Sequence, residues 1–342
     1  MGRRVGSNKN LKRLIDEPTQ GEIVLMDNAV KQALHTGDLE QAIRLAAQAV
    51  RTNPTCVAER ALYATLWCVK GDLLRSDQQL HVLLNQDPNL GVTIQPWREL
   101  LVAARHRNDV FMGTAAPALA HAATPAIETA LQRLLLLREK LLREKLLPDK
   151  RDTKPCILET DQNTNITDEK TVSEPALIPI RVAKQDPSKP ENEWVWRDID
   201  WQDLDDRFAG IIELLSTNGQ YYWVDMCQVE RLSIIPPTTF LDQLWLPVEL
   251  SVRNGPSGRL YLPLVYPGMP GLTVNDYESV YTLGQRTDWL SLNDEGREMI
   301  TTETEEAEQA VWLSIGRGRR TWFIDESICD VSDLADCSLC GC

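Results

Sequence analysis

The residues best suited to chemistry in this 342-residue chain are four thiols at its end, Cys329, Cys337, Cys340 and Cys342. A Cys-x-x-Cys pair with two further thiols can hold Zn²⁺ in a tetrahedral set. All four lie within the last 14 residues without a nearby His, whereas structural zinc sites usually combine two separated pairs. We therefore expect an unmetallated, flexible tail. The alternative is a metal- or redox-responsive regulator that acts through these thiols.

The acidic run that starts at Asp198 is a second candidate for metal binding. An EF-hand loop needs Gly at its sixth position and Glu at its twelfth, where this chain has Asp203 and Ala209. This mismatch excludes a calcium loop. We expect Asp203 to cap a helix that ends near Ser216, and Arg207 to pair with a neighbouring aspartate.

The sequence contains no recognisable catalytic motif. It lacks G-x-S-x-G, a P-loop and H-E-x-x-H, and its four His all precede residue 122. The run Gly316-Arg-Gly-Arg can contact a phosphate through backbone amides, but a turn between strands explains it equally well. An unrecognised enzyme site has only the Asp and Trp residues near 196–223 in its favour. We expect no enzymatic activity and no cofactor.

Charge and hydropathy narrow the class of protein. With 50 acidic and 36 basic side chains the net charge is −14, which disfavours binding to nucleic acid. The only tight basic cluster near the carboxy terminus is Arg317, Arg319 and Arg320. No stretch is apolar enough to span a membrane or to serve as a signal peptide. We expect a cytoplasmic protein with reduced thiols.

A repeat organises the amino-terminal third. Gly37-Asp38-Leu39 returns as Gly71-Asp72-Leu73, and Pro54 returns as Pro88, both 34 residues later. This is the period of a tetratricopeptide helix pair, in which Gly ends one helix and Asp caps the next. The pattern predicts helices over 22–36, 38–52, 56–70, 73–86 and 93–107.

Aligning the two repeats on their Gly-Asp turns predicts a concave groove lined by small and apolar residues. An amphipathic helix from a partner would fit such a groove. The candidate partner-binding residues are Leu34, Ala58, Ala61, Thr65 and Cys68. Alternatively, the Leu-rich helix predicted over 126–147 covers this surface from within the same chain, because exposed apolar grooves are rare.

Composition divides the chain into segments. We expect a flexible lead-in (1–20), a tetratricopeptide-like helical domain (21–147), a disordered linker (148–192), a Trp-rich domain (193–327) and the Cys-containing tail (328–342). Short apolar runs and the turn signal Asn254-Gly255 predict an antiparallel sheet in the Trp-rich domain. The fold class expected is α+β, with an α-helical repeat domain followed by an α+β domain.

Several motifs of the carboxy-terminal half resemble those of one family, the ImpE (SciE, TagJ) accessory proteins of bacterial type VI secretion. The runs, in order, are Trp196-Arg-Asp-Ile-Asp-Trp-Gln-Asp-Leu-Asp-Asp-Arg, Asn218-Gly-Gln-Tyr-Tyr-Trp-Val, Leu241-Asp-Gln-Leu-Trp-Leu-Pro-Val, Leu262-Pro-Leu-Val-Tyr-Pro-Gly, Leu283-Gly-Gln-Arg-Thr-Asp-Trp and Gly316-Arg-Gly-Arg-Arg. The family also carries tetratricopeptide-like helices at its amino terminus. The segment 148–192 and the tail after Ser327 depart from the family pattern.

The resemblance implies a non-enzymatic adaptor. Its implied partner is the amino-terminal helix of the small contractile-sheath subunit, with an indirect influence on the AAA+ unfoldase, and with no nucleic acid or membrane as partner. The family-motif positions in this chain are Asp198, Asp200, Arg207, Tyr222, Trp223, Arg286 and Trp289.

Overall fold

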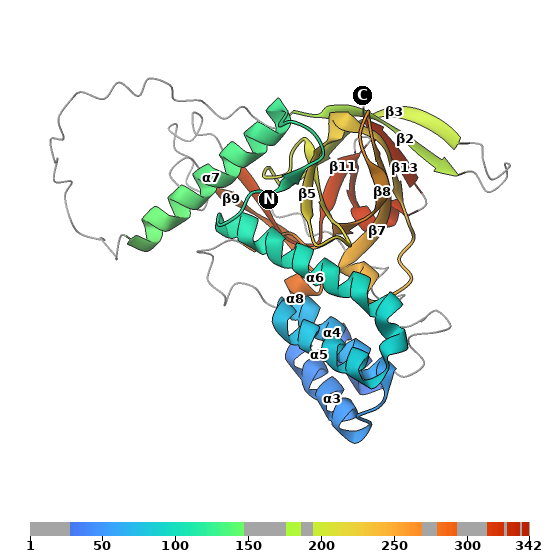
Figure 1. Cartoon of the computed structure of the whole chain (residues 1–342). Helices are drawn as coiled ribbons and strands as arrows, with labels where there is room; N and C mark the ends of the chain where they lie inside the picture. The colour runs from blue at the N-terminus through green and yellow to red at the C-terminus, as the bar shows by residue number, and fades with distance from the viewer. Residues whose placement is uncertain are drawn as a thin grey trace, which may run out of the picture.

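The protein consists of an amino-terminal helical region and a sheet-rich region with mostly antiparallel strands (Figure 1). The computed structural model describes residues 28–146, 176–185, 194–268, 279–292, 313–324, 327–335 and 337–341. In Figure 1 the helical repeats lie below the sheet, and one long helix, α6, crosses between the two regions. The expected α+β class is confirmed. No helix within the described ranges is long and apolar enough to cross a membrane.

The repeat helices follow the local signals in the sequence. They are α2 (Asn28–His35), α3 (Leu39–Thr52), α4 (Val57–Lys70) and α5 (Leu73–Gln86). The Asp38 carboxylate accepts a hydrogen bond from the backbone N–H of Gln41 (2.8 Å), and Asp72 repeats this cap on Arg75 (3.0 Å). Gly71 ends α4 with φ 83°, a conformation that favours glycine.

Helix α6 (Gly91–Met112) belongs to both regions. It follows a short 3₁₀ turn (Pro88–Leu90) and is longer than the predicted 93–107. Its first half packs against α5, and its second half packs against the strands β4 (Ile211–Leu215) and β5 (Tyr221–Asp225). A single hydrophobic core therefore runs from the repeats into the sheet.

The Leu-rich helix α7 (Pro125–Leu146) covers the sheet and not the repeats. Its buried residues Ile127, Ala130 and Leu134 share a core with Phe208 and Trp223. The alternative in which this helix fills the repeat groove is therefore wrong. The helix runs along one side of the sheet-rich region in Figure 1.

One curled sheet of 11 strands dominates the second region, in the order β1-β5-β4-β8-β7-β6-β13-β2-β3-β11-β12. The Asn254-Gly255 turn is confirmed between β7 and β8, with Asn254 at φ 51°. A bridge between Val265 and Arg319 joins the chain after β8 to the chain before β11, so the sheet curls back on itself. The remaining bounds are β1 (Ala118–Leu119), β2 (Ile178–Gln185), β3 (Trp194–Asp203), β6 (Val229–Ile234), β7 (Trp245–Val252), β8 (Ser257–Pro263), β11 (Thr321–Ile324), β12 (Ser327–Asp330) and β13 (Cys337–Gly341).

Two smaller elements lie beside this sheet. Strands β9 (Thr287–Leu292) and β10 (Leu313–Gly318) form an antiparallel pair, and a one-turn helix, α8 (Ser279–Thr282), precedes β9. Helix α8 contacts α4 of the repeats and β10. It therefore provides a second connection between the two regions.

The boundaries expected for the linker and the tail are wrong where the structure describes them. Strand β2 lies inside 148–192, because Ile180 and Val182 alternate with outward-facing residues and enter the sheet core. The tail residues form β12, a 3₁₀ turn and β13, and β13 pairs with β2 on one side and β6 on the other. The lead-in 1–20 and the rest of the linker lie outside the described residues.

The helix expected from Asp203 to Ser216 is also wrong. Strand β3 ends at Asp203, successive turns occupy 204–210, and β4 occupies Ile211–Leu215. The apolar residues of β4 are buried on both faces, so their continuous run gives no alternation by which to recognise a strand.

Candidate functional site

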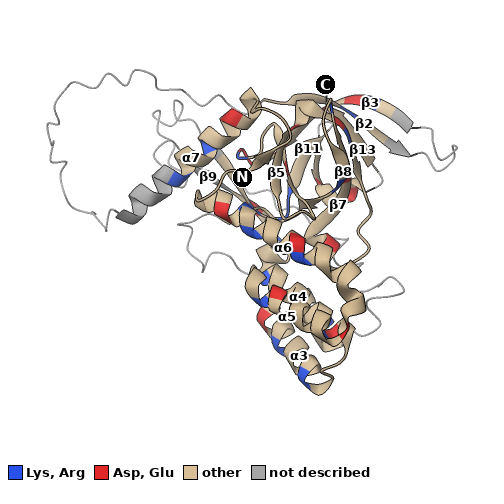
Figure 2. Ribbon diagram, in the orientation of Figure 1, with Lys and Arg blue, Asp and Glu red and all other residues tan. Residues whose placement is uncertain are grey.

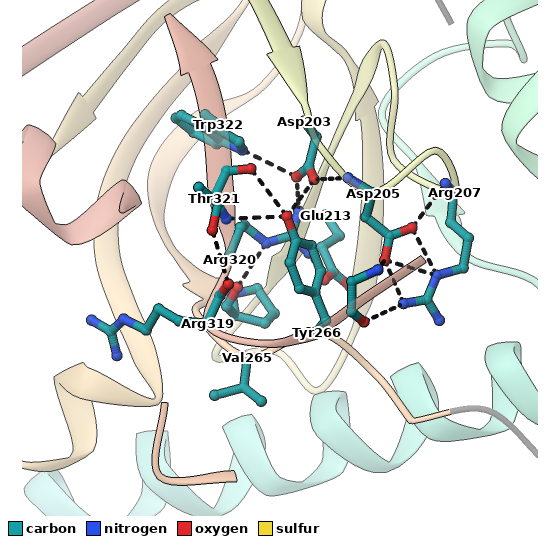
Figure 3. A network of polar contacts seen from close by, with 12 residues as sticks. Asp203, Asp205, Arg207, Glu213, Val265, Tyr266, Arg319, Arg320, Thr321 and Trp322 are labelled. Atoms are coloured by element: carbon teal, nitrogen blue, oxygen red, sulfur yellow. Dashed lines mark hydrogen bonds and ion pairs between the residues drawn. The ribbon is translucent and has the colours of Figure 1, made fainter. Parts of the chain in front are cut away.

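Side chains from three motifs of the carboxy-terminal half, together with Glu213 and Arg107, form one cluster of buried charges, which we call the buried network; Figure 3 shows its part in the sheet-rich region. Six elements contribute to it: the end of β3, the turn after it, β4, the segment after β8, the segment before β11, and α6. Its members are Arg107, Asp203, Asp205, Arg207, Glu213, Tyr266 and Arg320.

Arg320 is the centre of the buried network. Its side chain is fully buried, and its two terminal nitrogens donate to Asp203 and to Glu213. Its Nε donates to the carbonyl of Pro263 (3.0 Å). The guanidinium also lies over the rings of Phe208 and Tyr266. Every nitrogen of this side chain therefore has a partner, as a buried charge requires.

Glu213 connects the sheet to the helical region. Its oxygens accept two hydrogen bonds from Arg107 of α6 (2.6 and 2.7 Å), one from Tyr221 (2.5 Å) and one from Arg320. Burial alone would raise the pKa of Glu213, but Arg107 and Arg320 together lower it below its usual value. The carboxylate is therefore ionised and fixes α6 against β4.

Asp203 and Asp205 organise the turn after β3. The Asp203 carboxylate accepts from Tyr266 Oη (2.8 Å), from Trp322 Nε1 (3.1 Å) and from the backbone of Asp205, besides Arg320. Asp205 forms a two-pronged ion pair with Arg207 (2.5 and 2.9 Å), which confirms the expected pairing of Arg207 with a neighbouring aspartate. Asp203 is a buried acceptor and not the expected helix cap. Burial raises its pKa to about 6, although Arg320 opposes this shift.

The buried network is suited to holding elements together rather than to turning over a substrate. Its charged side chains are almost completely buried and satisfy one another. A catalytic acid, base or nucleophile needs a face that reaches the reacting atoms. Its ion pairs hold the helical region, the turn after β3 and the segment before β11 against one another.

Asp206 supplies a test of these electrostatics. It is 7% exposed, its Oδ2 accepts from the backbone N–H of Ser314 (2.6 Å), and burial raises its pKa from 3.8 to about 6. Because the folded state binds this proton more tightly than the unfolded state, the contribution of Asp206 to stability grows as pH falls from 7 to 4. We expect Asp206→Asn to keep the hydrogen bond from Ser314 and to lose the stability gained as pH falls. The free energies of unfolding of the two proteins should differ by at most about 3 kcal/mol.

Urea denaturation at pH 4, 5, 6 and 7 measures this effect. The free energy of unfolding of Asp206→Asn should exceed that of the natural protein at pH 7, and the two should converge towards pH 4. Parallel curves for the two proteins would contradict the raised pKa.

The family-motif positions occupy very different surroundings. Of these, the buried network includes Arg207 alone. Asp198 and Asp200 are exposed on β3, Tyr222 and Trp289 are half-buried, and Arg286 is exposed. Trp223 is fully buried and donates to Tyr221 Oη (2.6 Å), next to Glu213.

Sequence reasoning missed Glu213, Tyr266, Arg320 and Arg107 as members of one cluster. Glu213 was visible as a single charge within an apolar run, Ile211-Ile-Glu-Leu-Leu, and Arg320 as the charge directly before another, Thr321-Trp-Phe-Ile. Such a charge in a buried strand requires a partner. That signal indicates burial and pairing, but it does not indicate which charge is the partner.

The basic cluster near the carboxy terminus is not a surface for phosphate. Arg319 and Arg320 are buried, and Arg319 pairs with Asp330 (3.0 Å) and donates to the carbonyl of Gln243 (2.7 Å). Arg317 pairs with Asp288 (2.9 Å) on the neighbouring strand β9. The two last motifs of the resemblance are therefore the two strands of one ladder.

The thiols near the end of the chain lie on different strands or on opposite faces of one strand. Cys337 faces the core, and Cys340 faces the other side of β13, because residues three apart on a strand point in opposite directions. Cys329 lies on β12, and burial raises its pKa to about 12. Among the described residues no three His, Cys, Asp or Glu side chains could hold a metal ion, and Cys342 lies outside them. The expected flexible tail is wrong.

Of the five predicted partner-binding residues, Cys68 alone lines the cavity at the junction of the two regions. Leu34, Thr65 and Cys68 are buried, while Ala58 and Ala61 are half-buried. Two side chains of the sheet-rich region, Phe240 and Leu283, complete the hydrophobic core that contains Leu34. A helix from a partner protein could therefore contact Leu34 directly only if the helical region and the sheet-rich region separated.

An open cavity does exist at the junction of the two regions, and we call it the junction cleft. Its volume is about 450 Å³. It lies between the α4–α5 turn and the start of α3, the second half of α6, the start of β7, the segment after β8, and α8. Its lining includes Glu40, Cys68, Lys70, Leu73, Ala104, Arg107, Asn108, Trp245, Val265 and Tyr266.

Comparisons of this chain with known proteins find the same family that the sequence motifs resemble. Residues 197–338 match the model of the ImpE protein family, so the resemblance to that family is confirmed over the sheet-rich region. The chain is 24% identical over 271 residues to the type VI secretion system accessory component TagJ of Pseudomonas aeruginosa, covering 79% of this chain and 83% of that protein.

A solved structure shares the fold. It is the crystal structure of protein VPA1032 from Vibrio parahaemolyticus, which has a TM-score of 0.62 and 23% identity, with 92% of this chain and 97% of the other covered. The arrangement of helical region and curled sheet is therefore similar in that protein.

Proposed function

We propose that this protein is an accessory component of a type VI secretion system that works by binding another protein and not by catalysis. The observation that carries the proposal is its similarity to TagJ, which extends over most of both chains. The buried network supports it, since its charged side chains hold structural elements together.

The proposed partner is the amino-terminal helix of the small contractile-sheath subunit, and the proposed location is the cytoplasm. An influence on the associated AAA+ unfoldase would then be indirect, through the sheath subunit. Two features support this partner: a helical-repeat region of the kind that binds helices, and an apolar cleft beside it.

Calorimetry tests the proposal. The purified full chain is titrated with a synthetic peptide of the amino-terminal helix of the small sheath subunit encoded by the same organism. We expect saturable binding with one site per chain, and no binding of a peptide with the same composition in scrambled order. If neither the helix peptide nor the complete sheath subunit binds, the proposal fails.

A further inference from the structure

Helix α8 and the turn after it (residues 279–286), which we call the α8 segment, have two faces, one towards each region. Val280 and Leu283, three residues apart on one side of the turn, contact the repeats. Tyr281 lies on the other side, where its hydroxyl donates to Asp288 of β9 (2.6 Å). The α8 segment is therefore attached to the β9–β10 ladder and presents an apolar face to the repeats, next to α4 (Figure 1).

The contact of the α8 segment with the repeats resembles the binding of a helix in a groove. Leu283 is 5% exposed and shares a core with Leu34 of α2 and Leu66 of α4. The side-chain amide of Gln285 donates to the carbonyl of Leu34 (2.5 Å), near the end of α2. Apolar residues spaced i, i+3 are the usual anchors of an amphipathic helix bound in a groove. The repeats therefore already hold a short helical ligand from their own chain.

The two repeats differ at this contact. Gly37 and Gly71 are equivalent positions of the repeat, with φ 77° and 83°. A Cβ at Gly37 would lie 2.8 Å from Val280 and 3.1 Å from Gln285, whereas a Cβ at Gly71 would meet no described atom within 4 Å. The α8 segment therefore covers the turn of the first repeat and does not reach that of the second.

The two connections between the regions differ in their chemistry. The repeat helices carry charges of both signs (Figure 2), but the residues of the α8 segment that contact them, Val280, Leu283 and Gln285, are uncharged. At the other connection Arg107 of α6 donates to the buried carboxylate of Glu213. Apolar contacts can be exchanged for those of another amphipathic helix, whereas breaking a buried ion pair leaves a charge unpaired. We therefore expect the regions to separate first at α8 and to remain joined at α6.

We propose that the α8 segment is an internal competitor of the partner helix: it occupies the face of α2 and α4 on which that helix binds, and the helix displaces it. This inference rests on the proposed function and adds its regulation. Of the residues predicted from the sequence it retains Leu34, which lies under the α8 segment. Since Ser279 and Thr282 line the junction cleft, displacement of α8 would extend that cleft onto the repeats.

Weakening the internal contact tests the proposal. A helix that must displace the α8 segment binds with an affinity reduced by the fraction of molecules in which the segment is already displaced. Gln285→Ala removes a hydrogen bond that holds the segment on the repeats. We expect the sheath-subunit helix peptide to bind this variant about fivefold more tightly than the natural protein, the effect of one hydrogen bond.

Gln86→Ala is the matched control for this variant. The side-chain amide of Gln86 also donates to a backbone carbonyl, that of Pro54 (3.0 Å), but this bond lies before the start of α4 and away from the turn after α2 that α8 covers. Its affinity for the peptide should equal that of the natural protein. Calorimetry measures both affinities, and circular dichroism checks that both variants are folded.

A substitution at the covered turn provides a second measurement. The Cβ of Gly37→Ala would press on Val280 and Gln285. Gly71→Ala is matched to it, because it strains the same left-handed backbone at the equivalent position without meeting α8. We expect Gly37→Ala to bind the peptide at least about twofold more tightly than Gly71→Ala.

The outcomes separate this inference from the function on which it rests. If the natural protein and all four variants bind no peptide, the proposed function fails and this inference fails with it. If the natural protein binds, and neither Gln285→Ala nor Gly37→Ala binds more tightly than its control, the α8 segment is not a competitor and the proposed function stands. Weaker binding by Gln285→Ala would make Gln285 a part of the binding site and would also overturn the inference.

Discussion

Replacing Arg320 with methionine is expected to destabilise the sheet-rich region by about 3–5 kcal/mol, the usual cost of removing one member of a buried ion pair. Asp203 would remain buried without its main counter-charge, and Glu213 would keep only Arg107 as a counter-charge. Methionine preserves much of the apolar contact with Phe208 and Tyr266, so the lost charge dominates the effect. Because whole domains are stable by only about 5–15 kcal/mol, much of the protein should be unfolded or insoluble.

Urea denaturation followed by tryptophan fluorescence measures this loss, since the chain has 10 Trp. Arg286→Met is the matched control, because Arg286 is 53% exposed on its side chain and lies 3.5 Å from Asp288. An exposed pair of this kind contributes less than about 1 kcal/mol. Equal denaturation midpoints for the two variants would contradict a stabilising role for the buried network.

Ending the chain after Ala335 is expected to prevent the sheet from forming. The truncation removes β13, which lies between β6 and β2. Leu339 is fully buried, and its burial contributes about 2–3 kcal/mol. Each backbone hydrogen bond of the ladder adds about 1 kcal/mol, so the total loss is comparable to the stability of a whole domain. The edges of β6 and β2 would also be left unpaired, which favours aggregation.

Solubility and size-exclusion chromatography measure the effect of the truncation. Cys340→Ser in the full chain is the control, because this half-buried thiol faces away from the core and its replacement should leave the protein folded. A truncated protein that elutes as a monomer with the natural circular dichroism would show that β13 is dispensable.

The repeat helices were predictable because their signals are local. The caps at Asp38 and Asp72 and the left-handed Gly71 act over a few residues, and the ends of α3, α4 and α5 lie within one residue of the prediction. The same applies to the turn at Asn254, where the sequence itself selects the backbone conformation.

The strands β2 and β13 could not be predicted because their partners are far away in the chain. Cys337–Gly341 is rich in thiols and short, and it becomes a strand through pairing with residues 180–184 and 232–233. Strand propensity depends on such neighbours more than helix propensity does. The pairing of Arg320 with Glu213 has the same character, because 107 residues separate the two.

The position of the cleft depends on how two regions pack. The repeat pattern indicates a concave surface, but it does not indicate that Phe240 and Leu283 cover part of it. The contact between Gln285 and Leu34 joins residues 251 positions apart. Long-range contacts of this kind decided which predicted surface residues are buried.

The central place of the last strand has a consequence for synthesis in the cell. The repeats can acquire their structure while the ribosome is still translating, because their contacts are local. The curled sheet lacks an interior strand until residues 337–341 have left the exit tunnel. A newly made chain therefore presents its repeats before its sheet can be completed.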